Sequence, residues 1–458
     1  MWFTLPIELQ RQCLQAVDVP TLKSFRLANK SVSTLATEIL FSIVNLKSNR
    51  TSADNFNNIV ENDALRLLVR TVIINTSDDP NIVEYSSGEA DPDPWLKKSL
   101  KKIPQFQTLR EVRLIFSRWC AGENTESWGP EIVEGLHFRT EVLWRTFKPL
   151  ARVIREGGLK YFDTLTLRNL QNYVDDDIYY SEDFATVLGK VKKLHLCIAT
   201  ESDEVINGNG DRRSPRQMFQ YDLVPRWLSP VSAQLTHLTL YATDIFWGFL
   251  PFCDLREIYF PRLQSLSLGY YTIVHDWQID WILSHAATLE ELLLDGCAIV
   301  SAANLDASQV ISHWPDLKPY LKDPETDEDS YLKEVDLRWH QILPRFQTEL
   351  PRLHHFAIGR GDRENPRMFE QRYDLVPHMI WDRYFIFDYV DYLSPWMTSG
   401  MDWFLSNPRT TEPKHLYKHG DVKGYPTLCF PACYIEDRDA LAALLEVTKR
   451  RAQEKADL

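Results

Sequence analysis

The sequence predicts an α/β protein in which three short N-terminal helices precede a solenoid of short parallel strands, with helices on its outer side. Amphipathic helical patterns separated by turn signals occupy residues 5–46. Beyond them, a pattern of alternating buried positions typical of short strands recurs between residues 69 and 358. Segments of helical periodicity lie between these strand patterns. Alternation of strands and helices over such a length indicates parallel strands, here expected on the concave face of the solenoid.

The first helix is expected to begin at Leu5-Pro6, because proline suits the first helical position, and to end at Asp18-Val19-Pro20. A second helical pattern stops at Asn29-Lys30, and Ser31 is expected to cap the third. Residues 41–46 then have the pattern of a strand. Helices this short bury little apolar surface by themselves, so a partner protein is expected to cover part of it. The alternative is a small helical unit at the start of a larger domain.

At these residues the chain resembles the F-box. The matching residues are Leu5-Pro6-x-Glu8-Leu9, Cys13-Leu14, Asp18, Leu22, Phe25-Arg26-Leu27-Ala28 and Ser33-x-Leu35-Ala36. The strand at residues 41–46 resembles the one that follows the box in many fungal members, whereas the tryptophan often found near the start of the third helix is replaced around Val32. The resemblance covers about a tenth of the chain. It implies docking to the Skp-type adaptor of an SCF cullin–RING ubiquitin ligase. The residues it implies as adaptor contacts, or as their support, are Leu5, Pro6, Ile7, Leu9, Leu14, Leu22, Phe25 and Leu27.

The strand patterns have the form L-x-x-L-x-L. They begin at Val69, Leu109, Phe162, Val191, Leu235, Leu263, Leu289, Leu332 and Leu353. The patterns that begin at 235, 263 and 289 are 28 and 26 residues apart, within the range of a leucine-rich repeat. The chain therefore resembles an irregular leucine-rich-repeat array over about residues 60–365. Helices are expected at Trp95–Lys102, Glu141–Glu156, Trp277–Ala287 and Ala303–Trp314. An α/β domain with a few parallel strands is the alternative.

These patterns divide the chain into an F-box at residues 1–47, an irregular leucine-rich-repeat-like solenoid at 48–383, and a C-terminal cap at 384–458. Aromatic residues and prolines crowd together after Tyr384, as in a terminal unit that closes the end of a solenoid. A last helix is expected over Glu436–Lys455.

A substrate-binding surface is expected on the concave side of the solenoid, at positions between and just beyond the buried strand positions. Charged residues and tyrosines are mixed there, as they are in many recognition surfaces. The candidate residues are Arg113, Arg168, His195, Tyr241, Tyr271, Asp295, Asp336, Arg338 and Arg360.

The composition excludes several classes of protein. A net charge of −13 argues against a partner that is a nucleic acid. No run of about 18 apolar residues is present, so a membrane is not expected as a partner. The seven cysteines are scattered and no secretory signal is seen, which indicates a cytoplasmic or nuclear location. No G-x-S-x-G, H-E-x-x-H or P-loop motif is present, so we expect neither catalytic residues nor a cofactor.

One group of residues has ligand spacing for a metal. His415 and His419 are followed by Cys429 and Cys433, and two imidazoles with two thiols suit tetrahedral zinc. The pairs stand in reversed order, and Pro431 lies inside the second. The alternative is two solvated histidines and two core thiols, and the sequence favours no metal.

The resemblance implies a substrate-recognition subunit of an SCF ubiquitin ligase, in which the F-box binds the adaptor and the repeat domain binds a protein substrate. Such a subunit is not itself an enzyme. Two alternatives stay open: a scaffold that binds the adaptor without directing ubiquitination, and an enzyme whose helical N-terminus is incidental.

Overall fold

The computed structural model describes residues 5–28, 30–77, 91–121, 133–173, 175–200, 218–242, 245–306, 321–322, 330–361, 375–388, 391–393 and 431–457. Contacts within the chain divide it into two compact units. Unit 1 comprises Met1–Asn169 and Asp175–Val191, and unit 2 comprises Leu170–Val174 and Lys192–Leu458. The domain boundaries predicted from the sequence lay between residues 47 and 48 and between residues 383 and 384. Neither coincides with a boundary between the two units.

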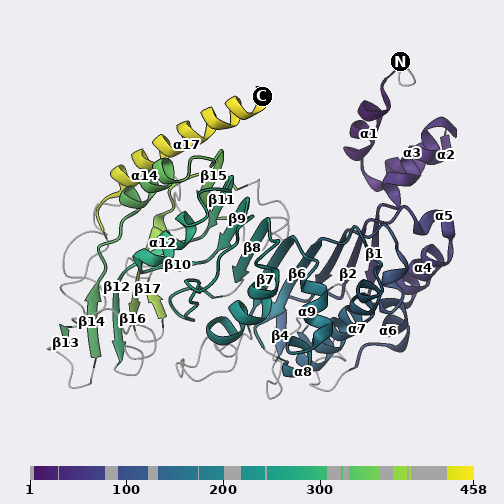
Figure 1. Ribbon diagram of the computed structural model, residues 1–458, viewed down its shortest axis with the longest axis horizontal. Coiled ribbons are helices and arrows are strands. Elements are labelled where there is room, and N and C mark those ends of the chain that lie inside the picture. The colour runs from purple at the N-terminus through teal and green to yellow at the C-terminus, as the bar shows by residue number, and fades with distance from the viewer. Residues whose placement is uncertain are drawn as a thin grey trace, which may run out of the picture. The chain divides into compact units, whose positions relative to one another are not determined.

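A nine-stranded sheet is the main element of the fold, and its strands follow one another in chain order (Figure 1). The strands are β1 (Ile43–Lys47), β2 (Thr71–Asn75), β3 (Glu111–Ile115), β6 (Thr164–Gln171), β7 (Lys193–Ala199), β8 (His237–Ala242), β9 (Ser265–Gly269), β11 (Glu291–Asp295) and β15 (His355–Gly359). The pairings within each unit are parallel.

The buried positions of the repeated pattern align across neighbouring strands. In unit 1, Val72 faces Val112, which in turn faces Leu165. In unit 2, Leu238 is paired with Leu266, and the same row continues across β11 to Phe356. This alignment explains the pattern in the sequence, because each strand places the same two positions in one apolar layer.

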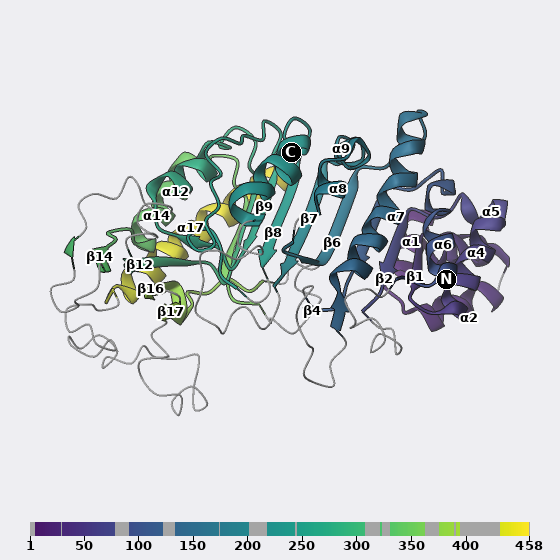
Figure 2. The same ribbon diagram turned by 90° about the horizontal axis from the view of Figure 1, so that it is seen from below.

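Apart from the three N-terminal helices, the main helices of unit 1 lie on one face of its strands (Figures 1 and 2). The N-terminal helices are α1 (Ile7–Gln15), α2 (Val19–Ala28) and α3 (Lys30–Leu40). They are followed by α4 (Arg50–Glu61), α5 (Asp63–Arg66), α6 (Pro94–Leu100), η3 (Ile103–Gln105), α7 (Leu136–Arg155), α8 (Asp176–Tyr179) and α9 (Glu182–Leu188). Helix α4 packs on α6, α6 on α7, and α7 on α9. Two short strands, β4 (Trp119–Ala121) and β5 (Val133–Gly135), form a separate parallel pair.

Unit 2 contains a second, mixed sheet of six strands. They are β10 (Thr272–Ile273), β12 (Ala298–Asp306), β13 (Leu321–Lys322), β14 (Ser330–Glu334), β16 (Tyr384–Asp388) and β17 (Asp391–Leu393). Its helical segments are η4 (Met218–Leu228), η5 (Ser229–Val231), α12 (Asp276–Leu283), α14 (Trp339–Glu349), η7 (Trp381–Arg383) and α17 (Tyr434–Ala456). Helix α17 packs against α14 and β15.

The predicted leucine-rich-repeat-like solenoid is wrong. The protein is an α/β protein with one large parallel sheet and a second sheet that contains antiparallel pairs. All residues of β9 are buried, and so are all but the first residue of β8, β11 and β15. Both faces of these unit 2 strands are buried, as in a parallel sheet that is covered on both sides. In β2 and β3 of unit 1, buried and half-buried residues alternate. The sequence pattern shows only that one face of each strand is buried. This is true of a solenoid and of a covered parallel sheet alike.

Most predicted strands and helices are nevertheless present. Eight of the nine patterns lie on strands of the large sheet. The ninth, which begins at Leu332, instead overlaps β14, which pairs antiparallel with β12 in the second sheet. The helix predicted at Ala303–Trp314 is wrong at its start, because β12 extends to Asp306, and residues 307–314 lie outside the described residues. The predicted C-terminal helix is confirmed as α17.

A buried histidine after α12 makes the stability of unit 2 depend on pH. His285 is fully buried, its Nε2 accepts a hydrogen bond from the Phe260 amide (3.2 Å), and its Nδ1 lies 2.9 Å from the Trp281 carbonyl oxygen. An Nε2 that accepts is unprotonated, and burial lowers the pKa of this imidazole below its usual 6.5. Below that pH the unfolded chain therefore binds a proton that the folded chain does not.

We expect the free energy of unfolding to fall as the pH is lowered from 6.5, with a slope of up to about 1.4 kcal/mol per pH unit from this group. Urea unfolding of His285→Gln between pH 5 and 7 measures this, and the variant should lose that part of the slope. The control is His378→Gln, because His378 is exposed and its replacement should change the free energy of unfolding at pH 7 by less than about 0.5 kcal/mol. Equal slopes in the wild type and His285→Gln would contradict the assignment.

Candidate protein-docking surface

The three N-terminal helices form where the sequence predicts them. Helix α1 (Ile7–Gln15) follows Pro6 and has Glu8 in its first turn, where the helix dipole favours an acid. Helix α2 (Val19–Ala28) begins after Asp18, whose Oδ1 accepts a hydrogen bond from the Thr21 amide (2.9 Å). Helix α3 (Lys30–Leu40) contains Ser31 inside its first turn rather than as its cap.

A small apolar core holds these helices together. Its members are Leu14, Leu22, Val32, Leu35 and Ala36, all at most 5% exposed, with Val17, Phe25, Ile39 and Leu40 packed against them. An ion pair between Arg11 and Glu38 (2.7 Å) joins α1 to α3. Both of these side chains are more than one-third exposed, so the core rather than the ion pair sets the arrangement.

Several large apolar side chains on α1 and α2 lie outside this core. Ile7 is 61% exposed, Leu9 44%, Val19 52% and Leu27 88%. We call these four the exposed apolar residues. Burying one such side chain contributes about 1.5–3 kcal/mol, so covering all four would provide a substantial part of the affinity for a partner. Exposed apolar side chains gathered on a short segment are typical of protein-interaction sites.

The structure separates the predicted adaptor contacts into three groups. Pro6, Ile7, Leu9 and Leu27 are exposed, whereas Leu14 and Leu22 belong to the small core. Leu5 and Phe25 are half-buried. Sequence reasoning did not select Val19, because its place in the first turn of α2 was interpreted as the end of α1. Helical periodicity could have identified Leu27 and Val19 as outward-facing once the true helix start was known.

Of the residues predicted to bind a substrate, three are buried in unit 2. Tyr271 is fully buried and Asp295 is 2% exposed; they receive hydrogen bonds from Gln278 Nε2 (2.8 Å) and the Gly361 amide (2.7 Å), respectively. Tyr241 is 7% exposed and its hydroxyl lies 3.4 Å from Ser267 Oγ. These side chains hold strands and loops together, which leaves little of their surface for a partner.

The other predicted substrate-binding residues are at least partly exposed. In unit 1, Arg113 donates to Glu111 (2.6 Å), and Arg168 is half-buried. In unit 2, Asp336 is exposed. Three further residues of unit 2 have intramolecular partners: the half-buried His195 has Thr239, the half-buried Arg338 has the Val335 and Leu337 carbonyls, and the exposed Arg360 has Asp382. These residues are distributed over both units, and a role in substrate binding stays a prediction.

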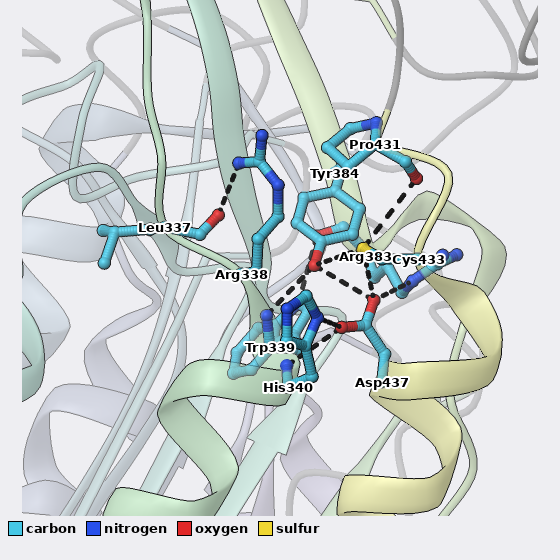
Figure 3. Close-up of polar contacts among 9 residues, drawn as sticks. All are labelled: Leu337, Arg338, Trp339, His340, Arg383, Tyr384, Pro431, Cys433 and Asp437. Carbon is cyan, nitrogen blue, oxygen red and sulfur yellow. Dashed lines mark hydrogen bonds and ion pairs between the residues drawn. The ribbon is translucent and has the colours of Figure 1, made fainter.

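A buried polar cluster lies where α17 meets α14 and β16. Figure 3 shows Asp437 pointing from the first turns of α17 toward His340, Arg383 and Tyr384. Its Oδ1 is 2.9 Å from both the His340 amide and Nδ1, and its Oδ2 accepts from Arg383 Nε at 2.8 Å and from the Tyr384 hydroxyl at 3.0 Å. Asp437 and Arg383 are at most 1% exposed. A buried carboxylate with this many donors is typical of a structural ion pair.

The geometry of this cluster does not suit nucleophilic catalysis. The Cys433 thiol is 3.3 Å from Asp437 Oδ2 and 3.4 Å from the Tyr384 hydroxyl, so the carboxylate rather than the imidazole is its close partner. Burial raises the pKa of this thiol to about 11, which disfavours the reactive thiolate. An activated cysteine needs a base positioned to accept its proton.

The same cluster is also the one group within the described ranges whose ligand atoms lie close enough to hold a metal: His340, Cys433 and Asp437, within 4.8 Å of one another. Both carboxylate oxygens already accept hydrogen bonds, and the Arg383 guanidinium supplies the positive charge that a metal ion would supply. The cluster therefore fits an ion-pair network better than a metal site. Of the four residues in the zinc candidate, His415, His419 and Cys429 lie outside the described residues.

The described helices include none that is both long and apolar enough to cross a lipid bilayer. Comparison with known protein families finds no matching family model, and comparison with curated proteins finds no match. The candidate docking surface on α1 and α2 is thus described by its exposed apolar side chains and by the motif given above.

Proposed function

We propose that the protein is a substrate-recognition subunit of an SCF-type ubiquitin ligase, in which α1 to α3 dock on a Skp-type adaptor. The observation that supports this proposal is the set of exposed apolar residues on a three-helix unit whose motif resembles the F-box. If the three helices needed no partner, we would expect these side chains to be buried against other residues of the same chain.

The activity we propose is not catalytic. The adaptor connects the protein to a cullin–RING ligase, and the remainder of the chain holds a protein substrate near the ubiquitin-loaded conjugating enzyme. Holding two reactants on one assembly raises their effective concentration without new chemistry. This work would take place in the cytoplasm or the nucleus.

The docking step is tested by measuring the affinity of the full chain for a purified Skp-type adaptor by biolayer interferometry. The variant Ile7→Ser/Leu27→Ser removes two exposed apolar side chains, so we expect about a 100-fold loss of affinity, since each is worth about 1.5 kcal/mol or more on burial. Circular dichroism should show an unchanged fold, because neither side chain belongs to the small core.

Ile435→Ser is the matched control. Ile435 is 61% exposed, the same fraction as Ile7, but lies on α17 in unit 2. Its replacement should leave adaptor binding within about twofold of the wild type, which corresponds to less than 0.5 kcal/mol. An unchanged affinity of Ile7→Ser/Leu27→Ser, or no adaptor binding by the wild type, would reject the docking assignment.

A substrate-recognition subunit and a scaffold differ in whether the bound protein is ubiquitinated and degraded. If the protein directs ubiquitination, a bound substrate should have a shorter half-life in cells with the protein than in cells without it. The docking variant should restore the longer half-life. Equal half-lives in all three cases would favour the scaffold.

A further inference from the structure

Unit 1 contains a groove at the N-terminal ends of three neighbouring strands. The turns that precede β2, β3 and β6 line it, and its volume is about 670 Å³. A volume of this size accommodates two or three side chains of a bound segment. The residues that matter for recognition are Arg66, Leu67, Gln105, Thr108, Lys160 and Tyr161.

The turns that form this groove are fixed by hydrogen bonds of one side chain to the backbone and by two residues in the left-handed conformation. Thr108 Oγ1 donates to the carbonyl oxygens of Leu67 (2.9 Å) and Val69 (2.8 Å), which fixes two of the three turns to each other. In the third turn Gly157 and Leu159 have φ values of 83° and 50°. Glycine adopts such a conformation readily, but for leucine it costs of order 1–3 kcal/mol. Strain of this kind is concentrated at functional sites, and here it places Lys160 and Tyr161 on the rim.

The charge of the groove differs from that of the whole protein. The chain has a net charge of −13, yet the charged residues among those that line the groove, Arg66 and Lys160, are both basic. Arg66 forms an ion pair with Asp63 (2.6 Å) and also donates to the Val60 carbonyl oxygen (3.1 Å), and its side chain is 26% exposed. The exposed Lys160 is therefore the lining cation that a partner reaches more easily. The Arg110 guanidinium lies 5.7 Å from the centre of the Tyr161 ring and adds positive charge to the rim.

Apolar surface lies beside these cations. Leu67 is 50% exposed and Tyr161 54% exposed, and both line the groove. An occupant that covers them must carry an apolar side chain, and one that complements the cations must carry carboxylates. A nucleic acid fits less well, because few cations line the groove and the net charge of the chain repels phosphates.

We propose that this groove binds an extended segment of a partner protein in which an apolar side chain is flanked by aspartate or glutamate. The apolar side chain packs between Leu67 and Tyr161, and a carboxylate pairs with the exposed Lys160. The groove shares no residue with the exposed apolar residues of α1 and α2, so this proposal does not depend on adaptor docking.

The experiment uses a phage-displayed library of random 16-residue peptides, selected on the full chain. Selection is run in parallel on the groove variant Lys160→Glu/Tyr161→Ser and on the control variant Lys449→Glu/Tyr221→Ser. Lys449 and Tyr221 are also exposed, and they lie in unit 2. Enriched peptides are then synthesised with a fluorescent label, and their affinities are measured by fluorescence polarisation.

We expect the wild type and the control variant to enrich peptides with acidic residues around a leucine or an aromatic residue. Those peptides should bind the groove variant at least tenfold more weakly, and their affinity should fall between 50 and 300 mM salt because ion pairs are screened. Enrichment of basic or uncharged peptides, no enrichment over the groove variant, or stronger competition by a 20-base-pair DNA duplex than by unlabelled peptide would each overturn the proposal.

Discussion

Replacing Asp437 with alanine is expected to lower the free energy of unfolding of unit 2 by about 3–5 kcal/mol. The carboxylate is fully buried, and it is the ion-pair partner of Arg383, which is 1% exposed. Without this carboxylate the buried Arg383 guanidinium has lost its ion-pair partner, and the donors of His340 and Tyr384 have lost their acceptor. Removing one partner of a buried ion pair costs more than the pair itself contributes.

Urea unfolding followed by tryptophan fluorescence measures this loss, because Trp339 in α14 lies next to the cluster. Asp439→Ala is the matched control: Asp439 is on the same helix, is 64% exposed and pairs with the exposed Arg438. Its effect should be within about 0.5 kcal/mol of zero. A loss below about 1 kcal/mol in Asp437→Ala would show that the cluster is not a buried ion pair in solution.

The second large effect concerns unit 1, where alanine at position 139 is expected to lower the free energy of unfolding by about 3 kcal/mol. The Arg139 side chain is buried on α7 and donates to the carbonyl oxygens of Asn169 (2.6 Å), Ser117 (2.7 Å) and Trp119 (3.1 Å). Its guanidinium also lies 5.3 Å from the centre of the Phe116 ring. Alanine removes these donors from buried acceptors and leaves a cavity.

Urea unfolding followed by circular dichroism checks this expectation. Arg152→Ala is the matched control, because Arg152 is on the same helix, is 77% exposed and pairs with Glu156. That change should cost less than about 0.5 kcal/mol. Equal stabilities of the two variants would mean that Arg139 does not bind these carbonyls in solution.

Much of the local structure could be predicted from the sequence. The spacing of Val72 and Ile74, or of Leu292 and Leu294, records which side of a strand faces the apolar layer, and the strands are present there. The position of α1 near Pro6 also follows from local signals, although Pro6 precedes the helix instead of occupying its first turn. These features depend on residues that are neighbours in the chain, so a pattern can record them. Leu22 was expected to be covered by a partner, but it belongs to the small core.

The fold class could not be predicted in the same way. The pattern of β8 is the same whether its other face is open or covered, and only the folded chain covers it. For the same reason, Tyr241, Tyr271 and Asp295 were expected on an exposed surface but are buried. The position of β14 in the second sheet depends on its pairing with β12, which the local pattern at Leu332 does not record.

By itself, the sequence determined where the short helices and strands lie and that α1 to α3 carry more apolar surface than three short helices can bury. Only the tertiary structure decided which of those side chains stay exposed, that Asp437 meets His340 across 97 residues of chain, and that three separate turns form one basic groove. The physical reason is that local periodicity depends on backbone geometry over a few residues. Burial and charge pairing depend instead on which distant segments the folded chain brings into contact.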